Sequence, residues 1–161
     1  MSRKLIFASN NENKLKELIN ITRELELGDA IEIVSLKDIG LDIEVEETFP
    51  TLEENALKKA KEVYKNMKDE YKNSLVIAED FGFFIEELPK VAGVKSNRWH
   101  KGTDEDRNSE VLRLMKNIDN RKCYYKSVFA TYDGETERVF SGYTYGNVAE
   151  EKKGTNGFAY D

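Results

Sequence analysis

Residues 75–88 read LVIAEDFGFFIEEL and join an apolar run to two acidic residues. Its first four residues are apolar, and a short apolar run of this kind is typical of a buried strand. We expect a strand over residues 74–80 and a hairpin continuation of it over 82–88. The acids Glu79 and Asp80 end the run, where ligands of α/β sheets tend to bind. They are candidate ligand-binding groups, with a solvent-facing strand end as the alternative.

Strand-like and helix-like patterns alternate along the rest of the chain. Apolar runs predict strands over residues 4–9, 30–36 and 123–149, the last as a hairpin that turns at Asp133-Gly134. Apolar residues at helical spacing predict helices over residues 11–27, 51–71 and 104–118. The sequence therefore predicts an α/β fold with a mixed twisted sheet flanked by helices, in one domain over residues 1–161.

Two of these helices carry start signals. Thr51 followed by Glu54 fits a capping box, in which the side chains of the cap and of the third helical residue satisfy free backbone N–H groups. Thr103 stands directly before the third predicted helix and is a second N-cap candidate.

Composition and charge exclude several classes of function. The chain has 161 residues, 39% hydrophobic, and a net charge of −6 with acidic and basic residues interspersed. It has no basic stripe to follow a phosphate backbone, so we expect no nucleic-acid partner. No apolar run is long enough for a signal peptide or a membrane span, so we expect no membrane partner. The single cysteine, Cys123, favours a reducing compartment, and we expect a cytoplasmic protein.

The triplet Asp80-Phe81-Gly82 also occurs as the metal-binding triplet of protein kinases, but the context excludes that class. The chain has no Gly-rich phosphate loop, no His-Arg-Asp triplet and too few residues for two lobes. The only histidine, His100, rules out a histidine-based metal cluster and is expected in an exposed loop. We expect Cys123 to be a buried, inert thiol.

Oxygen-ligand chemistry remains. Ser9 and Asn11 stand where the first predicted strand turns into the first predicted helix, and a helix N-terminus offers free N–H groups to an anion. Lys14 falls in the first turn of that helix and could reach the same anion. The alternative is that Ser9 and Asn11 only cap the helix. Glu47 precedes the second predicted helix and Lys59 lies within it, where charged groups often only face solvent.

Five blocks, taken in order, resemble the inosine/xanthosine triphosphate pyrophosphatase family over nearly the whole chain. They are ASNNENKLKE (8–17), ETFPTLEENALKKA (47–60), AEDFGFFIEELPKVAGVKSNRW (78–99), FSGYTYG (140–146) and GTNGFAYD (154–161). The resemblance implies an elongated domain with a central nucleotide cleft. It also implies hydrolysis of non-standard purine nucleoside triphosphates (ITP, XTP and dITP) to the monophosphate and pyrophosphate.

The resemblance assigns roles to residues of each block. Glu47 and Asp80 would bind Mg²⁺, a cation that prefers a few carboxylates together with phosphate oxygens and water. Asp80 would also be the catalytic residue that orients or deprotonates the attacking water. The substrate would be held at its phosphates and at its base by Ser9, Asn11, Lys14, Lys59, Phe158, Tyr160 and Asp161. Phe158 would stack on the purine, since every base offers a π-face.

Departures from the family pattern keep a second hypothesis open. Phe81 stands where the family has serine, and the chain ends at Asp161, short of the family's Ser-His-Arg segment. The rival is a catalytically weak or inactive nucleotide-binding or interaction module on the same scaffold. A specificity for modified pyrimidine triphosphates is a third, smaller possibility.

The resemblance also suggests a homodimer. Independent support comes from a cluster of tyrosines in the predicted hairpin, at positions 124, 125, 132, 143 and 145. Aromatic residues are enriched at protein interfaces. The alternative is that these tyrosines are ordinary strand-forming residues.

Overall fold

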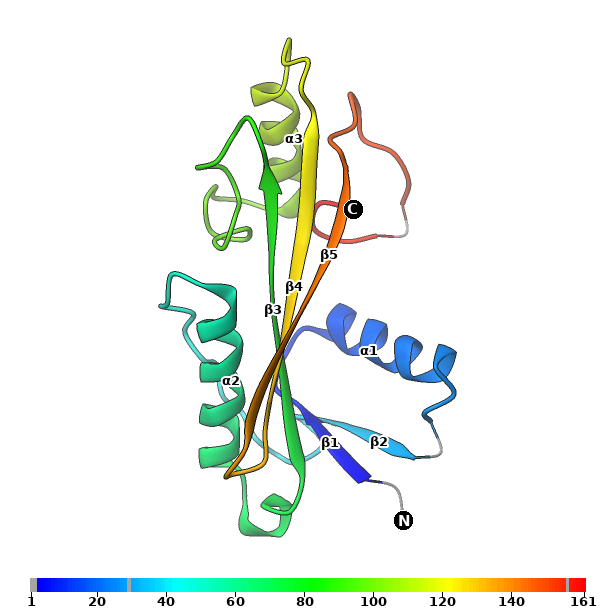
Figure 1. The fold of residues 1–161 in the computed structure, drawn as a ribbon, viewed down its shortest axis with the longest axis vertical. Coiled ribbons are helices and arrows are strands. Elements are labelled where there is room, and N and C mark those ends of the chain that lie inside the picture. Colours follow the sequence, from blue (N-terminus) through cyan, green and yellow to red (C-terminus); the bar gives the residue numbers. More distant parts are fainter. Residues whose placement is uncertain (1–2, 29, 156) are drawn as a thin grey trace. The chain divides into compact units, whose positions relative to one another are not determined.

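A computed structural model describes residues 3–28, 30–155 and 157–161 of the chain (Figure 1). The described residues form β1 (Arg3–Phe7), α1 (Glu12–Glu24), β2 (Ile31–Ser35), α2 (Leu52–Asn66), the short 3-10 helix η1 (Asp69–Tyr71), β3 (Leu75–Ile85), α3 (Asp104–Leu114), β4 (Lys122–Tyr132) and β5 (Glu137–Asn147). None of these helices is long and apolar enough to span a membrane.

The strands form one five-stranded sheet in the order β2-β1-β3-β4-β5. β1 pairs in parallel with both β2 and β3. The end of β3 lies beside the start of β4, because the Glu86 N–H donates to the Lys122 carbonyl, so these two strands run antiparallel. The predicted hairpin is confirmed: Asp133 Oδ1 accepts from the N–H groups of Glu135 and Thr136 in the turn between β4 and β5. The predicted mixed sheet flanked by helices is therefore confirmed.

The predicted hairpin at Gly82 is wrong, because β3 continues without a turn to Ile85. Phe81, which precedes Gly82, and Phe83 and Ile85, which follow it, are all buried in the strand. A Cβ atom at Gly82 would lie 2.8 Å from the Gly93 carbonyl oxygen. Gly82 is thus required for the close approach of another backbone segment and not for a turn.

The three predicted helices are confirmed, each shorter at its C-terminal end than expected. α2 stops at Asn66 because Met67 has an extended backbone, with ψ of 155°. Lys72 reaches back to the exposed carbonyl groups of Tyr64 and Lys65 at this helix end. Glu26 and Asn117 have left-handed backbones just beyond α1 and α3, and this conformation is common where helices end.

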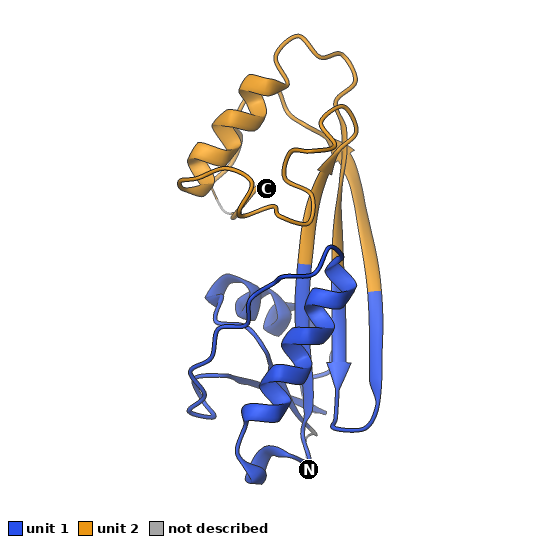
Figure 2. Cartoon of the chain, turned by 90° about the vertical axis from the view of Figure 1, so that its left-hand side faces the viewer, with its two compact units in different colours: residues 1–80, 128–140 blue, residues 81–127, 141–161 orange. Residues whose placement is uncertain are grey.

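The chain divides into two compact units (Figure 2). Unit 1 comprises residues 1–80 and 128–140, and unit 2 comprises residues 81–127 and 141–161. In unit 1, α1 and α2 lie on either side of the strands (Figure 1). α2 packs on the sheet through Ala60, Val63 and Met67, which join Ile6 and Val76 in one buried cluster. This packing fixes the direction in which the intervening residues of α2 project.

Unit 2 has its own core. Val111 of α3 and Met115, which follows it, pack with Phe83 and Ile85 of β3 and with Cys123 of β4. The predicted buried thiol is therefore confirmed, and burial raises the pKa of Cys123. α3 begins at Thr103 with a full capping box, because Thr103 and Asp106 exchange side-chain to backbone hydrogen bonds. A well-anchored α3 is what positions the polar side chains on its first turns.

Candidate active site

The turn from β1 into α1 is fixed by the polar side chains predicted there. Asn11 is the N-cap of α1, and its Oδ1 accepts from the backbone N–H groups of Asn13 (2.9 Å) and Lys14 (3.2 Å). Ser9 Oγ accepts from the Asn11 N–H at 3.1 Å. Both side chains therefore cap the helix here, as the capping interpretation expects. Their oxygens also lie beside the helix N-terminus, where a phosphate group would be attracted.

Lys14 projects from the first turn of α1 and is unusually buried for a lysine, with 9% of it exposed. Its Nζ lies 3.6 Å from Oε2 of Glu79, in the middle of β3. Burial lowers the pKa of Lys14, and the negative charge of Glu79 opposes this effect. A buried ammonium that faces one carboxylate is well placed to bind a further anion.

Lys59 of α2 brings the two predicted metal-binding acids together. Its Nζ lies 2.8 Å from Glu47 Oε1 and 3.8 Å from Asp80 Oδ1, and it also donates to the Glu79 carbonyl. Glu47 lies in the irregular segment before α2, and Asp80 lies in the middle of β3. The sequence-predicted residues Lys14, Glu47, Lys59 and Asp80 thus form one cluster of alternating charge in unit 1.

Asp80 is the most buried acid of the cluster, with 6% of its side chain exposed. Burial raises the pKa of Asp80 to about 6, against the lowering effect of Lys59. The nearby charge of Glu47 adds to the rise, and a hydrogen bond from Asn55 lowers the pKa. A carboxyl group tuned to this range can take up and release a proton near neutral pH, as a general base must.

Asn55 is fully buried and was not predicted as a site residue. Its side chain accepts from the Phe49 N–H at 2.9 Å and donates to the Phe49 carbonyl at 3.2 Å. Two bonds to one residue fix the backbone next to Glu47, so Asn55 joins the segment that carries Glu47 to the side chain of Asp80. The sequence block that contains Asn55 was noted, but its role becomes apparent only from these contacts.

The cluster has the donor chemistry of a Mg²⁺ site, although it is small. Within residues 3–28, 30–155 and 157–161, no group of three or more His, Cys, Asp or Glu side chains is arranged to hold a metal ion. The two carboxylates that were predicted as ligands both lie beside the Lys59 ammonium. Two carboxylates suit Mg²⁺ where substrate oxygens and water complete the shell. The residues present therefore fit the predicted cation.

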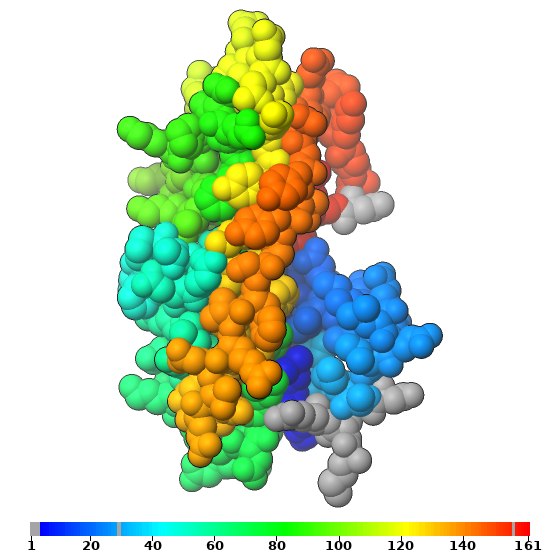
Figure 3. All heavy atoms as spheres, viewed as in Figure 1, coloured from blue at the N-terminus to red at the C-terminus, as the bar shows by residue number. Residues whose placement is uncertain are grey.

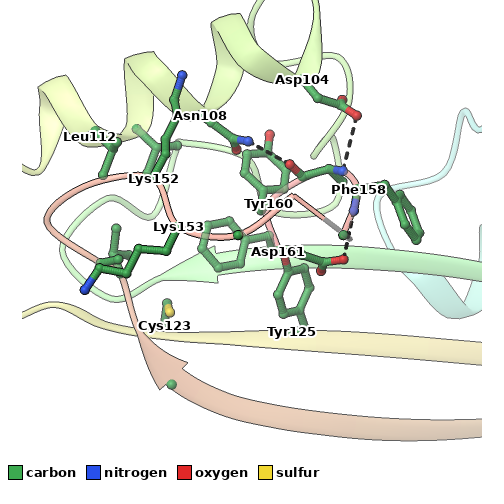
Figure 4. Close-up of a pocket in the computed structure, with 18 of the residues that line it drawn as sticks. Asp104, Asn108, Leu112, Cys123, Tyr125, Lys152, Lys153, Phe158, Tyr160 and Asp161 are labelled. Atoms are coloured by element: carbon green, nitrogen blue, oxygen red, sulfur yellow. Dashed lines mark hydrogen bonds between the residues drawn. The ribbon is translucent and has the colours of Figure 1, made fainter.

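The three remaining predicted residues lie in the C-terminal turn of unit 2 and line a pocket of about 800 Å³ (Figure 4). The Phe158 N–H donates to Asp161 Oδ2 at 3.0 Å, and the Asp161 N–H donates to the Phe158 carbonyl at 3.1 Å. The neighbouring Asn156, part of the same sequence block, lies outside the described residues.

Tyr160 is held on three sides. Its hydroxyl accepts from Trp99 Nε1 at 2.6 Å and donates to the Ser96 carbonyl, and its ring stacks on Phe83 with a centroid distance of 4.8 Å. Burial raises the pKa of Tyr160, and the bond from Trp99 opposes this effect. Trp99 lies 61 residues from Tyr160 in the chain, so no local sequence pattern indicates this contact.

Phe81, the residue that departs from the family pattern, is buried in unit 2. Its ring lies 6.3 Å from that of Tyr125, and its carbonyl accepts from Ser96 Oγ. The side chain that follows Asp80 therefore contributes to the core.

Comparison with known proteins agrees with the resemblance. The model of the Ham1 family matches residues 5–161. A dITP/XTP pyrophosphatase of Caldanaerobacter subterraneus subsp. tengcongensis is 36% identical over 162 residues, which cover 98% of this chain and 77% of that protein. A dITP/XTP pyrophosphatase of Leptospira interrogans is 38% identical over 165 residues, which cover 100% of this chain and 79% of that protein.

Solved structures give the same result. The Staphylococcus aureus Ham1 protein is similar with a TM-score of 0.79 at 28% identity, covering 99% of this chain and 79% of that one. A nucleoside-triphosphatase / dITP/XTP pyrophosphatase from Mycobacterium abscessus is similar with a TM-score of 0.71 at 34% identity, covering 98% of this chain and 80% of that one. The family match over almost the whole length, joined to these likenesses, shows that the chain belongs to the Ham1 family.

Proposed function

We propose that the protein is a Mg²⁺-dependent pyrophosphatase that hydrolyses non-standard purine nucleoside triphosphates, such as ITP, XTP and dITP, to the monophosphate and pyrophosphate. The observation that carries the proposal is the buried cluster in which Lys59 lies between Glu47 and Asp80, with Lys14 nearby. The names of similar relatives, dITP/XTP pyrophosphatases, support the substrate class. We further propose that it acts in the cytoplasm.

The two lysines are suited to bind the triphosphate. A nucleoside triphosphate carries about four negative charges, and the protein is itself acidic. Nearby cations are therefore needed to offset the repulsion between the phosphate groups and the protein. Lys14 and Lys59 each already face carboxylates, and each can exchange part of that contact for a phosphate oxygen. Ser9 and Asn11 would contribute at the N-terminus of α1.

Asp80 is suited to accept the proton of the attacking water. The water oxygen forms a bond to the α-phosphorus, the bond from that phosphorus to the bridging oxygen breaks, and pyrophosphate leaves with the electron pair. The proton released by the water goes to the Asp80 carboxylate. In the metal-free protein, burial raises the pKa of this carboxylate to about 6, above that of an ordinary aspartate. A bound Mg²⁺ would offset the negative charge of the phosphates as it moves to the leaving group.

The C-terminal turn of unit 2 is suited to hold the base. Phe158 would stack on the purine, and Tyr160 and Asp161 would hold its edge, Asp161 through the turn that it closes with Phe158. A donor directed at the 6-oxo group of hypoxanthine or xanthine would face another donor in adenine. That mismatch would reject the standard base.

The direct test is pyrophosphate release from ITP, XTP, GTP and ATP, each with Mg²⁺ and with a chelator. Metal-dependent release that favours ITP or XTP supports the proposal. A folded protein that releases pyrophosphate from none of them contradicts it and favours the rival, a nucleotide-binding module without turnover. Pyrophosphate release from modified pyrimidine triphosphates alone would contradict the assignment of a purine substrate but not the proposed hydrolysis reaction.

We also propose that the protein forms a homodimer through the aromatic surface of β5. Every residue of β5 is exposed at the edge of the sheet, and the strand appears in orange on the face drawn in Figure 3. In unit 2, Tyr143 is 51% and Tyr145 75% exposed. These two rings stack at a centroid distance of 6.2 Å, and both lie against Tyr124. Sedimentation velocity should show a dimer that Tyr143→Ser with Tyr145→Ser dissociates. A monomeric parent protein at tens of micromolar would contradict the proposal.

A further inference from the structure

We propose that Asp104 and Asn108 of α3 are positioning residues for the C-terminal turn and thereby set the affinity for the base. The inference rests on the proposed function insofar as Phe158 contacts the purine. Asp104 and Asn108 lie on a different element, α3, and bond the residue that follows Phe158. Neither residue belongs to the blocks that carry the family resemblance.

The two side chains hold both sides of one residue, Ala159. Asp104 Oδ2 accepts from the Ala159 N–H at 3.2 Å, and Asn108 Nδ2 donates to the Ala159 carbonyl at 2.8 Å (Figure 4). Residues four apart lie on the same face of a helix, so α3 presents this acceptor and this donor together. The N–H and the carbonyl of Ala159 are therefore both hydrogen-bonded to α3, and these two bonds restrain the backbone of Ala159.

Ala159 needs this support because of its conformation. Its φ is +51°, in the left-handed region that an alanine enters only at a cost in free energy. On one side of it, a Cβ at Gly157 would lie 2.5 Å from the Asp161 Cβ, so the turn is tight. A strained, tight turn keeps one geometry only when surrounding contacts impose it.

The direction of the Phe158 ring depends on the backbone conformation of this turn. Its backbone is joined to Asp161 in both directions, and Tyr160 is fixed by Trp99 and Phe83. The ring of Phe158 itself points away from α3 (Figure 4). The direction of the ring therefore depends on a backbone that α3 holds at the next residue.

The exposure of the two groups favours a local role. The side chain of Asp104 is 48% exposed and forms an ion pair with Arg107, and Asn108 lies at the edge of the pocket. Half-exposed hydrogen bonds contribute little to global stability, since water replaces them on unfolding. Their loss should loosen the turn without unfolding unit 2, so the effect should be seen in base binding.

The test uses the full chain with Asn108→Ala and Asn108→Asp, which remove the donor by truncation and by isosteric replacement. Glu110→Ala is the matched control, because it breaks the Glu110–Arg113 ion pair on the same helix and leaves the Ala159 bonds in place. Isothermal calorimetry measures the binding of IMP, which has the base, and of pyrophosphate, which lacks it. Thermal unfolding of each variant checks that the fold is retained.

We expect Asn108→Ala to weaken IMP binding about fivefold, the effect of one hydrogen bond, and Asn108→Asp to weaken it more. Pyrophosphate binding should change less than about twofold, and KM for ITP should rise with little change in kcat. The only tryptophan, Trp99, bonds Tyr160 in the same turn, so its emission should shift in both variants and not in Glu110→Ala.

IMP binding equal to that of the parent protein, or an equal loss of IMP and pyrophosphate binding, would overturn the inference. So would a parent protein that does not bind IMP. A parent protein that binds IMP but hydrolyses no triphosphate overturns the proposed function alone, because the IMP and Trp99 measurements still decide the role of Asn108.

Discussion

The Nζ of Lys59 lies 3.8 Å from Oδ1 of Asp80, a carboxylate with only 6% of its side chain exposed. A buried acid and a half-buried lysine at this distance stabilise each other's charges, and removing one takes away part of the other's counter-charge. The same ammonium is 2.8 Å from Glu47. The three charges are therefore interdependent, and a change at any one of them should alter both binding and stability.

Replacing Lys59 with methionine should lower kcat/KM for ITP by about 100-fold, the typical loss for one electrostatic contact to a transition state. Glu47 and Asp80 would then face each other without the intervening ammonium, and the triphosphate would lose a cation. Steady-state pyrophosphate release measures the effect. Lys58→Met is the matched control, because Lys58 is the next residue of α2 and bonds the Glu46 carbonyl and Thr48 outside this cluster. Equal losses in both variants would contradict a specific role for Lys59.

Replacing Asp80 with asparagine should abolish turnover and stabilise the metal-free protein at neutral pH. An acid whose pKa is raised by folding, here from 3.8 to about 6, binds its proton more tightly in the folded state. The ionised Asp80 therefore lowers the free energy of unfolding. This loss is absent below pH 4, grows between pH 4 and 6, and reaches its full size above pH 6. Asparagine stays neutral and should raise the free energy of unfolding at pH 7.5 by about 1–3 kcal/mol.

Urea unfolding in the presence of a chelator, at pH 7.5 and at pH 4, measures this difference. The gain should be present at pH 7.5 and nearly absent at pH 4. Glu150→Gln, which removes an exposed acid, controls for the change in net charge. A variant that is less stable than the parent by the same amount at both pH values would contradict the prediction. It would show that the folded protein stabilises the ionised form of Asp80 and lowers its pKa.

Local sequence patterns predicted the elements of the fold because each depends on neighbours within a few residues. The helix starts at Asn11, Thr51 and Thr103 and the hairpin at Asp133 are such local features. The helix ends were less accurate, because the bond from Lys72 that completes α2 comes from beyond the helix. The predicted hairpin at Gly82 is wrong because the constraint on this glycine, the backbone at Gly93, lies 11 residues away in the sequence.

The residues of the candidate site fall into two groups, those that local sequence motifs predict and those that only the structure reveals. Lys14, Glu47, Lys59 and Asp80 were recognised through short motifs, and the structure brings them into one cluster. Their assigned roles in binding and catalysis stay predictions. Asn55 and Asn108 were missed because each acts through a backbone group, of Phe49 and of Ala159, which no residue pattern encodes. Side chains that support a site in this way become visible only with the fold.

Replacing Asn55 with alanine should destabilise unit 1 by about 2–3 kcal/mol, since it removes a fully buried amide and the two hydrogen bonds that this amide forms with the Phe49 backbone. The segment that carries Glu47 should also become mobile, so KM for Mg²⁺ should rise. Asn66→Ala is the matched control, because Asn66 lies exposed at the end of the same helix and donates to the Glu62 carbonyl within it. Urea unfolding and a Mg²⁺ titration of the rate measure the two effects. An unchanged Mg²⁺ requirement would separate Asn55 from the site.

Replacing Gly82 with alanine should destabilise unit 2 by about 1–3 kcal/mol, because overfilling a packed strand forces neighbours apart. The added Cβ would lie 2.7 Å from the Phe84 ring and 2.8 Å from the Gly93 carbonyl oxygen, and a backbone oxygen cannot easily move away. Gly142→Ala is the control, because in this exposed strand its added Cβ has no described residue within 4 Å other than its chain neighbours. Thermal unfolding should show a lower midpoint for the first variant alone. Equal midpoints would mean that the segment at Gly93 is not held against β3 in solution, contrary to the hydrogen bond from the Gly93 N–H to the Phe83 carbonyl.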